Sequence, residues 1–463
     1  MKISANNFRA YDIRGIYPKD FDVTAFQEIG SSVAHFLYDK LKRSPVIYLG
    51  YDVRTTAPML AYSLASGMVA AGAEVFFSGQ PFPFGVVLYS GSKGHDATAF
   101  VTASHLPPEW QGVKFYYADG VGFSEEDNQK IRDIYLSDNY QTTIKKQIWS
   151  SIKPIVIKHE YNDYIRFLKE NFSISKSLKV VVDTGNASAS LAAFDIFEAC
   201  GYDVIKLFAE VDPTFPNRSP EPEESTLQVL ISTVKKEKAD FGVAFDADGD
   251  RAVIIDETGT CLMPEQVGII LSKFLIQNRK RDTKDIPVVL ANVECSSTLE
   301  KVIGDIAEVK RVKVGHTYLT LEAKNTNAVL GMESSGHFVY PDYYLFDDAI
   351  LTPLLIGLVI QHGKIPLSNH LKSLPTLYKA KKTIDVPDEI KFTVIEQLVS
   401  DLERKFEVNP IDGASILLED GWVLIRASNT GPIIRITAEA SNLDIAKDIA
   451  SRFEKILKEK LPK

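Results

Sequence analysis

Residues 97–114 read Ala-Thr-Ala-Phe-Val-Thr-Ala-Ser-His-Leu-Pro-Pro-Glu-Trp-Gln-Gly-Val-Lys, a short apolar run that leads into a polar loop. The run 97–101 predicts a buried strand. Ser104 follows at the strand end, with His105 beside it, two prolines after it and Lys114 ten residues on. A hydroxyl presented in a stiff loop among basic side chains suits covalent chemistry on an anionic group.

Similar apolar runs alternate with helical patterns along most of the chain, which is typical of βα units around parallel or mixed sheets. The pattern starts three times. The expected strands are 45–49, 73–77, 179–183, 203–207 and 287–291, and the expected helices are 57–71, 190–200 and 263–277. We therefore predict three related α/β domains, although the sequence holds no strict repeat.

The last ninety or so residues follow a different pattern. Expected strands at 414–418, 421–426 and 433–437 precede an amphipathic helix at 443–461, which predicts an α+β module. Breaks in the pattern at Pro and Gly residues place the domain boundaries. The expected domains are residues 1–153, 154–258, 259–374 and 375–463.

The bulk properties exclude several classes of protein. A net charge of −9 and a pI near 5.5 argue against general binding to nucleic acid or to a membrane surface. No apolar run reaches transmembrane length and no signal core follows Met1, so a cytoplasmic location is expected. Cys200, Cys261 and Cys295 lack any CxxC spacing and fit reduced, buried thiols better than a disulfide or zinc site.

A second informative segment, Phe-Asp-Ala-Asp-Gly-Asp-Arg at 245–251, contains three carboxylates at alternate positions. Like charges this close repel one another unless a cation compensates them. Alternating Asp side chains on an extended loop can converge on one point, and hard oxygen ligands suit Mg²⁺. With Ser104 and its basic neighbours, this favours metal-assisted phosphoryl transfer. No Gly-x-Ser-x-Gly elbow surrounds Ser104, which makes acyl transfer less attractive.

The acidic segment also invites comparison with an EF-hand, because Glu257 falls at the twelfth position from Asp246. An EF-hand needs Gly at the sixth position, where this chain has Arg251. The flanks 241–245 and 252–255 predict strands rather than helices. The EF-hand interpretation is therefore rejected.

Two further polar loops are weaker signals. Gly-Met-Glu-Ser-Ser-Gly-His at 331–337 could bind sugar hydroxyls or could be a simple hairpin. Arg-Ala-Ser-Asn-Thr-Gly-Pro at 426–432 could cradle a phosphate or could be an ordinary Asn-Thr-Gly turn. Taken alone, neither loop decides between its two interpretations.

In this order, and together with Phe-Arg-Ala-Tyr-Asp-Ile-Arg-Gly at 8–15, these segments resemble the α-D-phosphohexomutase family, specifically its phosphomannomutase/phosphoglucomutase branch. The resemblance spans the chain. It implies three related α/β domains with mixed sheets and a C-terminal α+β domain around a central cleft. It also implies reversible exchange between hexose 1-phosphates and hexose 6-phosphates.

The resemblance assigns the covalent step to Ser104, which would carry a phosphate. One Mg²⁺ per chain would be held by a phosphoserine oxygen and by three carboxylates, those of Asp246, Asp248 and Asp250. The phosphoserine would donate its phosphate to the substrate and form a hexose 1,6-bisphosphate, which is also the expected activator. This intermediate would turn over in the cleft and return its other phosphate to Ser104.

Such a transfer needs charge neutralisation and alignment more than covalent assistance. By the resemblance, Lys114 and Arg251 would supply positive charge beside the metal ion. The candidates for proton transfer to and from the sugar hydroxyl are Arg14, His105 and His337, and the choice among them is open.

The other residues implied by the resemblance would bind the substrate. Glu333 and Ser335 match contacts to sugar hydroxyls and would hold either orientation of the ring. The residues expected beside them on the sugar side of the cleft are Lys313, His316 and Tyr11. The residues expected to hold the phosphate that is not reacting are Arg426, Ser428, Asn429 and Thr430.

The chain departs from the family pattern at a few positions. Leu106 stands where the family usually has Asn after the Ser-His pair, so a polar contact beside the nucleophile is missing. Gln111 replaces the usual Asn before Gly112, and Gly431 stands where relatives often carry a larger residue. None of these changes removes the nucleophile or a metal ligand.

The sequence of 426–430, Arg-Ala-Ser-Asn-Thr, resembles the glucose/mannose branch more than the glucosamine branch, which has Pro and Gly at its second and fourth positions. We therefore predict action on both glucose and mannose phosphates, with a phosphoglucosamine mutase or phosphopentomutase as the alternative. A sugar-phosphate-binding protein without catalysis and a phosphatase that uses Ser104 remain distinct hypotheses. The expected partners are small hexose phosphates, and the sequence predicts no oligomeric state.

Overall fold

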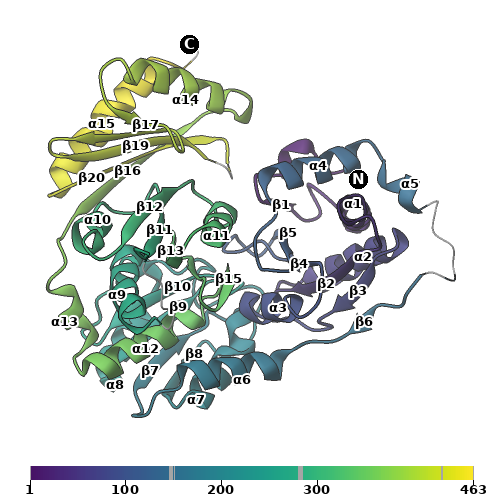
Figure 1. Cartoon of the computed structure of the whole chain (residues 1–463), viewed down its shortest axis with the longest axis horizontal. Helices are drawn as coiled ribbons and strands as arrows, with labels where there is room; N and C mark the ends of the chain where they lie inside the picture. The colour runs from purple at the N-terminus through teal and green to yellow at the C-terminus, as the bar shows by residue number, and fades with distance from the viewer. Residues whose placement is uncertain (1, 145–149, 151, 280–284, 429–430, 462–463) are drawn as a thin grey trace.

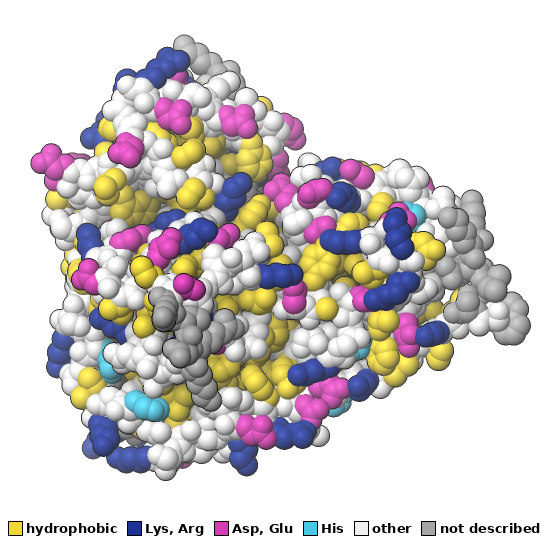
Figure 2. All heavy atoms as spheres, in the orientation of Figure 1, with side chains coloured by type: hydrophobic (Ala, Val, Ile, Leu, Met, Phe, Trp, Pro, Cys, Tyr) yellow, Lys and Arg dark blue, Asp and Glu magenta, His cyan; other side chains and the backbone are white. Residues whose placement is uncertain are grey.

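The computed structural model describes residues 2–144, 150, 152–279, 285–428 and 431–461. Four sheets with their helices follow one another in an arc, from the N-terminal domain to the C-terminal domain (Figure 1). Figure 2 shows an indentation in the outline between these two domains, and Lys and Arg side chains interspersed with Asp and Glu side chains on this face. No helix in the described ranges is long and apolar enough to span a bilayer.

The first sheet is mixed and has the order β1-β5-β4-β2-β3-β6. Its strands are β1 (Asp12–Ile16), β2 (Val46–Tyr51), β3 (Glu74–Phe77), β4 (Ala97–Val101), β5 (Trp110–Tyr117) and β6 (Val156–Ile157). Its helices are α1 (Val23–Leu41), α2 (Ala57–Ala70), α3 (Phe84–Gly91), α4 (Glu125–Leu136) and α5 (Tyr140–Ile144), after a 3₁₀ turn η1 (Ala5–Asn7). Helices α1 and α2 can pack closely because Gly30 and Gly67 have no side chain. A Cβ at either position would collide with a backbone oxygen of the other helix.

The second sheet, β10-β9-β7-β8, is also mixed. Its strands are β7 (Lys179–Asp183), β8 (Asp203–Leu207), β9 (Phe241–Phe245) and β10 (Ala252–Asp256). Its helices are α6 (Tyr161–Phe172), α7 (Ala193–Ala199) and α8 (Gln228–Glu237), with 3₁₀ turns η3 (Ser188–Leu191) and η4 (Glu224–Thr226). Strands β9 and β10 form an antiparallel hairpin with Phe245 opposite Ala252, so the acidic segment is the connection of a hairpin and no EF-hand.

The third sheet has the order β12-β11-β13-β14-β15, with parallel pairs followed by antiparallel ones. Its strands are β11 (Val288–Asn292), β12 (Glu308–Val312), β13 (Ala328–Met332), β14 (Phe338–Tyr340) and β15 (Tyr344–Asp347). Its helices are α9 (Pro264–Asn278), α10 (Thr298–Ile303), α11 (His316–Asn325), α12 (Leu351–Gly363) and α13 (Leu367–Leu371).

The fourth sheet is antiparallel throughout, in the order β16-β20-β19-β18-β17. Its strands are β16 (Tyr378–Asp385), β17 (Val408–Asn409), β18 (Ala414–Leu418), β19 (Gly421–Ala427) and β20 (Ile433–Ala440), and its helices are α14 (Asp388–Leu402) and α15 (Leu443–Lys458). This domain has a core of its own, whereas one continuous apolar core joins parts of the first three domains.

The predicted fold class, three mixed α/β domains and a C-terminal α+β domain, is confirmed. The helix predicted at 190–200 was too long, because a 3₁₀ turn and a break at Ala192, with φ −147°, precede α7. The helix predicted at 443–461 ends at Lys458. Strand β6 pairs with β3 of the first sheet, although it lies beyond residue 153, the expected end of the first domain. The expected domain boundaries stay predictions. Cys200 and Cys295 are buried, but Cys261 is partly exposed; all three are free.

Candidate active site

A cleft of 520 Å³ is lined by residues from all four domains. It contains ten of the residues that the sequence singled out, namely Tyr11, Arg14, Ser104, His105, Lys114, Arg251, His316, Glu333, Ser335 and His337. They come from loops, from strands β1 and β5 and from the start of α11, segments that are far apart in the sequence. The fold therefore brings most of the predicted site together.

Ser104 lies in the loop between β4 and β5 and is 2% exposed. Its backbone φ is 54°, in the left-handed region that costs a non-glycine residue about 1–2 kcal/mol. Its N–H donates to Thr102 Oγ1 at 2.8 Å, and its Oγ lies 3.3 Å from His105 Nδ1. A strained conformation of this kind persists only where the surroundings hold it.

The group that holds it is Arg54, whose side chain is fully buried behind the loop. Its guanidinium donates to backbone carbonyls of the loop at 2.6–3.2 Å, those of Ser104, Leu106, Pro107 and Trp110. Asp52 accepts from Arg54 Nε at 3.0 Å and fixes its plane. This pair was not predicted from the sequence, although Asp52 and Arg54 follow β2 at the same end of the sheet as Ser104.

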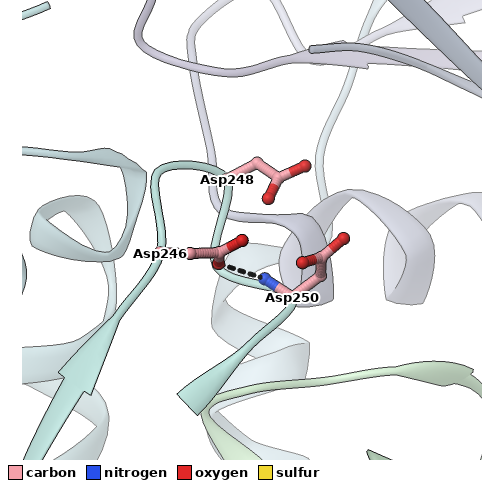
Figure 3. Close-up of side chains that lie close together, drawn as sticks. All are labelled: Asp246, Asp248 and Asp250. Atoms are coloured by element: carbon pink, nitrogen blue, oxygen red, sulfur yellow. Dashed lines mark hydrogen bonds between the residues drawn. The ribbon is translucent and has the colours of Figure 1, made fainter. Parts of the chain in front are cut away.

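The three carboxylates of the acidic segment lie around one point (Figure 3). Asp246 Oδ1 accepts from the N–H groups of Gly249, Asp250 and Arg251 at 3.0–3.1 Å, which folds the segment into a tight loop. Gly249 has a φ of 80° and packs against Pro83 of the first domain, so a side chain there would be strained and crowded.

The arrangement fits a divalent cation. One oxygen of each carboxylate lies within 4.8 Å of the others, and all three residues are at most 1% exposed. Asp246 Oδ2, Asp248 Oδ1 and Asp250 Oδ1 are buried without a hydrogen-bond partner. Burial and the charges of Asp250 and Asp248 raise the pKa of Asp246 well above its usual range. Hard oxygen ligands left unsatisfied in this way are what Mg²⁺ coordinates.

Lys114 and Thr102 connect this loop to the serine loop. Lys114 Nζ lies 3.2 Å from Asp248 Oδ2 and 2.7 Å from Asp250 Oδ2. These two carboxylates raise the pKa of Lys114 well above its usual value against the effect of burial, so the ammonium stays charged. Thr102 Oγ1 lies within hydrogen-bond distance of Asp248 Oδ2, at 3.1 Å, and also accepts from Ser104.

Arg251 joins two of the three histidines that line the cleft. Its Nη2 lies 2.7 Å from His105 Nδ1, and its Nε donates to His337 Nε2 at 3.0 Å. Burial and the charges of Arg251 and Arg14 lower the pKa of His105 far below its usual value, so this imidazole is neutral. Burial lowers the pKa of His337, but the charges of Asp250 and Asp347 outweigh this effect and raise it. His337 Nδ1 lies 3.2 Å from Asp347 Oδ2.

Two other predicted residues are held by local partners. Arg14 Nε donates to Asp12 Oδ1 at 3.0 Å. Burial lowers the pKa of Arg14, but the charge of Asp12 outweighs this effect and raises the pKa above its usual value, so Arg14 remains a cation. Burial and the charge of Lys114 lower the pKa of His316 well below its usual value, and its Nε2 lies 3.2 Å from the hydroxyl of Tyr116.

Glu333, which is expected to bind sugar hydroxyls, lines the cleft. Its Oε1 accepts from the Gly315 N–H at 2.7 Å and from Asn292 Nδ2 at 3.2 Å, and Ser335 Oγ donates to its Oε2 at 3.4 Å. Lys313 is exposed and does not line the cleft; its Nζ lies 5.7 Å from the centre of the Tyr318 ring.

Arg426, which is expected to hold a phosphate, is 2% exposed at the end of β19 and is not among the residues that line the cleft. Its Nε donates to Asp412 Oδ2 at 3.0 Å, and its buried Nη2 has no hydrogen-bond partner among the residues that the structure describes. Ser428 is buried, and Lys391 Nζ donates to the Gly431 carbonyl at 2.9 Å, which anchors the loop. Asn429 and Thr430 lie outside the described residues.

Comparisons with known proteins agree with this geometry. Domain families of phosphoglucomutase/phosphomannomutase match the chain in order: the α/β/α domains I, II and III at residues 5–142, 162–259 and 263–378, and the C-terminal domain at 384–456. The chain belongs to the α-D-phosphohexomutase family. The resemblance seen in the sequence is confirmed, and the protein is an intramolecular phosphotransferase.

Individual relatives of this phosphohexomutase carry different substrate names. A phosphoglucosamine mutase of Methanococcus aeolicus is 32% identical over 427 residues, which covers 90% of this chain and 92% of the relative. A phosphoglucomutase/phosphomannomutase of Thermococcus kodakarensis is 29% identical over 462 residues, which covers 98% and 99%. The crystal structure of a family protein from Burkholderia thailandensis superposes with a TM-score of 0.84 at 26% identity, covering 99% of this chain and 98% of that one.

The phosphohexomutase cleft also contains charged residues that the sequence analysis missed. Arg435 on β20 and Lys381 on β16 line it from the C-terminal domain, and Glu221 and Glu294 line it from the second and third domains. Arg435 pairs with Arg426 across β19 and β20, which places both guanidinium groups on one face of the sheet. A lone charge within an apolar strand, as in Ile-Ile-Arg-Ile at 433–436, was the available signal.

Proposed function

We propose that this phosphohexomutase interconverts the 1- and 6-phosphates of glucosamine through a phosphoserine at Ser104 and a 1,6-bisphosphate intermediate. The observation that supports it best is that Ser104 and Lys114 line one cleft with side chains from the C-terminal domain, while Lys114 contacts two of the three carboxylates of the acidic loop. The substrate is supported by the name of the Methanococcus aeolicus relative.

In the proposed transfer, the bond between phosphorus and Ser104 Oγ breaks as a bond forms to the free hydroxyl of the sugar phosphate. Mg²⁺ held by Asp246, Asp248 and Asp250 would neutralise charge on the transferring group when bound. Lys114 and Arg251 add fixed positive charge, and the left-handed conformation of Ser104 aims Oγ into the cleft.

The proton of the attacking hydroxyl must move to a base. Arg14 stays protonated beside Asp12, so His105 and His337 are the two candidates. Arg426 and Arg435 would hold the phosphate that is not reacting, while Glu333 and Ser335 would bind the ring hydroxyls in both orientations. After the bisphosphate turns over, its other phosphate returns to Ser104.

Glucose and mannose phosphates are the second candidate substrates. The sequence Arg-Ala-Ser-Asn-Thr at 426–430 and the Thermococcus kodakarensis relative favour them. A pentose phosphate has neither a sequence feature nor one of these relatives in its favour.

The test measures turnover with Mg²⁺ and a trace of the matching bisphosphate activator on the 1-phosphates of glucosamine, glucose, mannose and ribose. Mass spectrometry of a proteolytic digest locates phosphate on Ser104. We expect the highest kcat/KM on glucosamine phosphate and almost no release of inorganic phosphate, because the cleft is enclosed by four domains. Higher kcat/KM on glucose and mannose phosphates than on glucosamine phosphate would assign those two sugars as the substrates. Stoichiometric release of phosphate would indicate a phosphatase, and binding without turnover would indicate a catalytically inactive protein.

A further inference from the structure

Glu294 lies where the sugar side of the cleft meets the phosphate side. It follows β11 by two residues and lines the cleft. Its N–H donates to Asn292 Oδ1 at 3.1 Å, and its carbonyl accepts from Lys379 Nζ of the C-terminal domain at 2.8 Å. The backbone of Glu294 is therefore fixed from both sides.

The carboxylate of Glu294 contacts one residue of each half of the site. Oε2 accepts from Ser334 Oγ in the sugar loop at 3.2 Å, and Oε1 lies 3.4 Å from Arg426 Nη1. Arg426 already has a closer carboxylate partner, Asp412 at 3.0 Å. The contact with Glu294 is thus not needed to hold the Arg426 guanidinium in place. The negative charge of Glu294 also weakens the attraction between Arg426 and a phosphate.

The chemistry of a hexose 1-phosphate shows what this carboxylate would face. In the pose that the proposed function requires, the C6 hydroxyl would be at Ser104, the phosphate beside Arg426 would be the one on C1, and the C3 and C4 hydroxyls would be at Glu333 and Ser335. The ring carbon between C1 and C3 is C2. In the turned orientation the phosphate beside Arg426 is the one on C6, and the carbon between it and C4 is C5, which carries no polar substituent of its own.

From this juxtaposition we infer that Glu294 is a specificity-determining residue, which recognises a protonated amino group on C2 of the sugar. The inference rests on the proposed function. The hydrogen bond from an ammonium to a carboxylate joins two opposite charges. The C2 hydroxyl of glucose or mannose is an uncharged donor to the same carboxylate and binds it less strongly. The ammonium also compensates the repulsion between Glu294 and the neighbouring phosphate, a compensation that a hydroxyl lacks.

The test compares Glu294→Gln with Asp412→Asn, since each variant removes one carboxylate beside Arg426 and only Glu294 lines the cleft. In Glu294→Gln we expect kcat/KM for glucosamine 1-phosphate to fall roughly 10- to 100-fold more than kcat/KM for glucose 1-phosphate. In Asp412→Asn the two sugars should lose kcat/KM by the same factor.

A binding measurement gives a second readout that does not depend on turnover. Calorimetry is done on Ser104→Ala without Mg²⁺. In this state we expect the phosphate at Arg426, because the acidic loop at the other end then has three carboxylates and no metal ion, and Lys114 offsets them only in part. Adding Glu294→Gln should raise Kd for glucosamine 1-phosphate by roughly 10-fold or more and should change Kd for glucosamine 6-phosphate much less.

The outcomes separate this inference from the proposed function. If the wild-type protein does not turn over glucosamine phosphate, the proposed function fails and the inference fails with it. If the wild-type protein does turn it over, but Glu294→Gln lowers kcat/KM equally on both sugars, the proposed function stands. Glu294 would then only orient Arg426, and the inference would be overturned.

Discussion

Arg54 Nη2 lies 2.6 Å from the backbone carbonyl oxygen of Ser104, and the same guanidinium donates to three further carbonyls of that loop. Ser104 has a φ of 54°, so the residue proposed as the nucleophile is held in a strained conformation by a fully buried cation. Arg54 is thus a positioning residue: it sets where Oγ points without contacting the substrate.

Replacing Arg54 by Lys should lower kcat while KM changes little. Lysine presents its donors from a single nitrogen and cannot span the carbonyls that the planar guanidinium reaches. A loop displaced by about 1 Å would reduce kcat by roughly 10- to 100-fold. Steady-state kinetics on the wild-type protein and Arg54→Lys measure the split between kcat and KM.

The matched control is Arg279→Lys, because Arg279 is also largely buried and donates to the carbonyls of Asn327 and Ala328 and to Asp342, none of which lines the cleft. It should lower Tm and leave kcat unchanged. Equal kcat values for Arg54→Lys and Arg279→Lys would show that the hydrogen bonds of Arg54 to the serine loop do not position the nucleophile.

Ser104→Gly should be inactive and yet more stable than Ser104→Ala. Glycine adopts a φ of 54° without the steric cost that alanine and serine bear, which favours the glycine variant by about 1 kcal/mol. Both variants lack Oγ, so both should lose turnover by at least roughly 10³-fold. Urea unfolding and turnover of the two variants test this, and a glycine variant no more stable than the alanine variant would contradict the strain.

Asp248→Asn should raise the Mg²⁺ concentration that gives half-maximal activity. The change removes one of three converging negative charges, and loss of a carboxylate ligand weakens a hard divalent cation roughly 10-fold or more. In thermal unfolding, added Mg²⁺ should raise Tm less for the variant than for the wild-type protein.

Asp256→Asn is the control for this prediction, because Asp256 is also buried but accepts from Thr258 and Thr260 in a turn at the end of β10. It should lower Tm without changing the Mg²⁺ requirement. A Mg²⁺ titration of activity for Asp248→Asn that superimposes on that of Asp256→Asn would argue against the metal site.

Stability should fall with rising pH between about pH 9 and pH 11, in part through Cys200. Burial raises the pKa of the Cys200 thiol from 9.0 to about 11, so in this range the unfolded chain loses the proton that the folded chain keeps. Each pH unit in the window then lowers the free energy of unfolding by about 1.4 kcal/mol for this group. Below pH 9 its contribution is fully present.

The measurement is urea unfolding under reducing conditions at pH 8, 9, 10 and 11 for the wild-type protein and Cys200→Ala. The alanine variant should be less stable at pH 8 because a buried side chain is shortened, and its stability should decline less steeply above pH 9. Parallel curves for the two proteins would mean that Cys200 does not titrate in this window.

The sequence predicted strands such as 97–101, 179–183 and 241–245 with the bounds that the structure has, because buried strands are short apolar runs between turn residues. It did not predict β1 and β5, whose polar residues Arg14 and Lys114 face the cleft and interrupt the apolar pattern. The sequence does predict β19 and β20, which carry Arg426 and Arg435, because apolar residues surround each arginine.

By itself the sequence determined the fold class, the position of Ser104 at a strand end and the grouping of three carboxylates in one loop, because each is a property of neighbouring residues. Only the tertiary structure decided that Arg54 clamps the serine loop, that Arg435 faces the cleft and that Glu294 stands between Ser334 and Arg426. These relationships join residues up to 132 positions apart in the chain. They depend on which side chains the packing of four domains turns toward one cleft. A local pattern such as the lone charge of Arg435 can mark a candidate residue but cannot identify its partners.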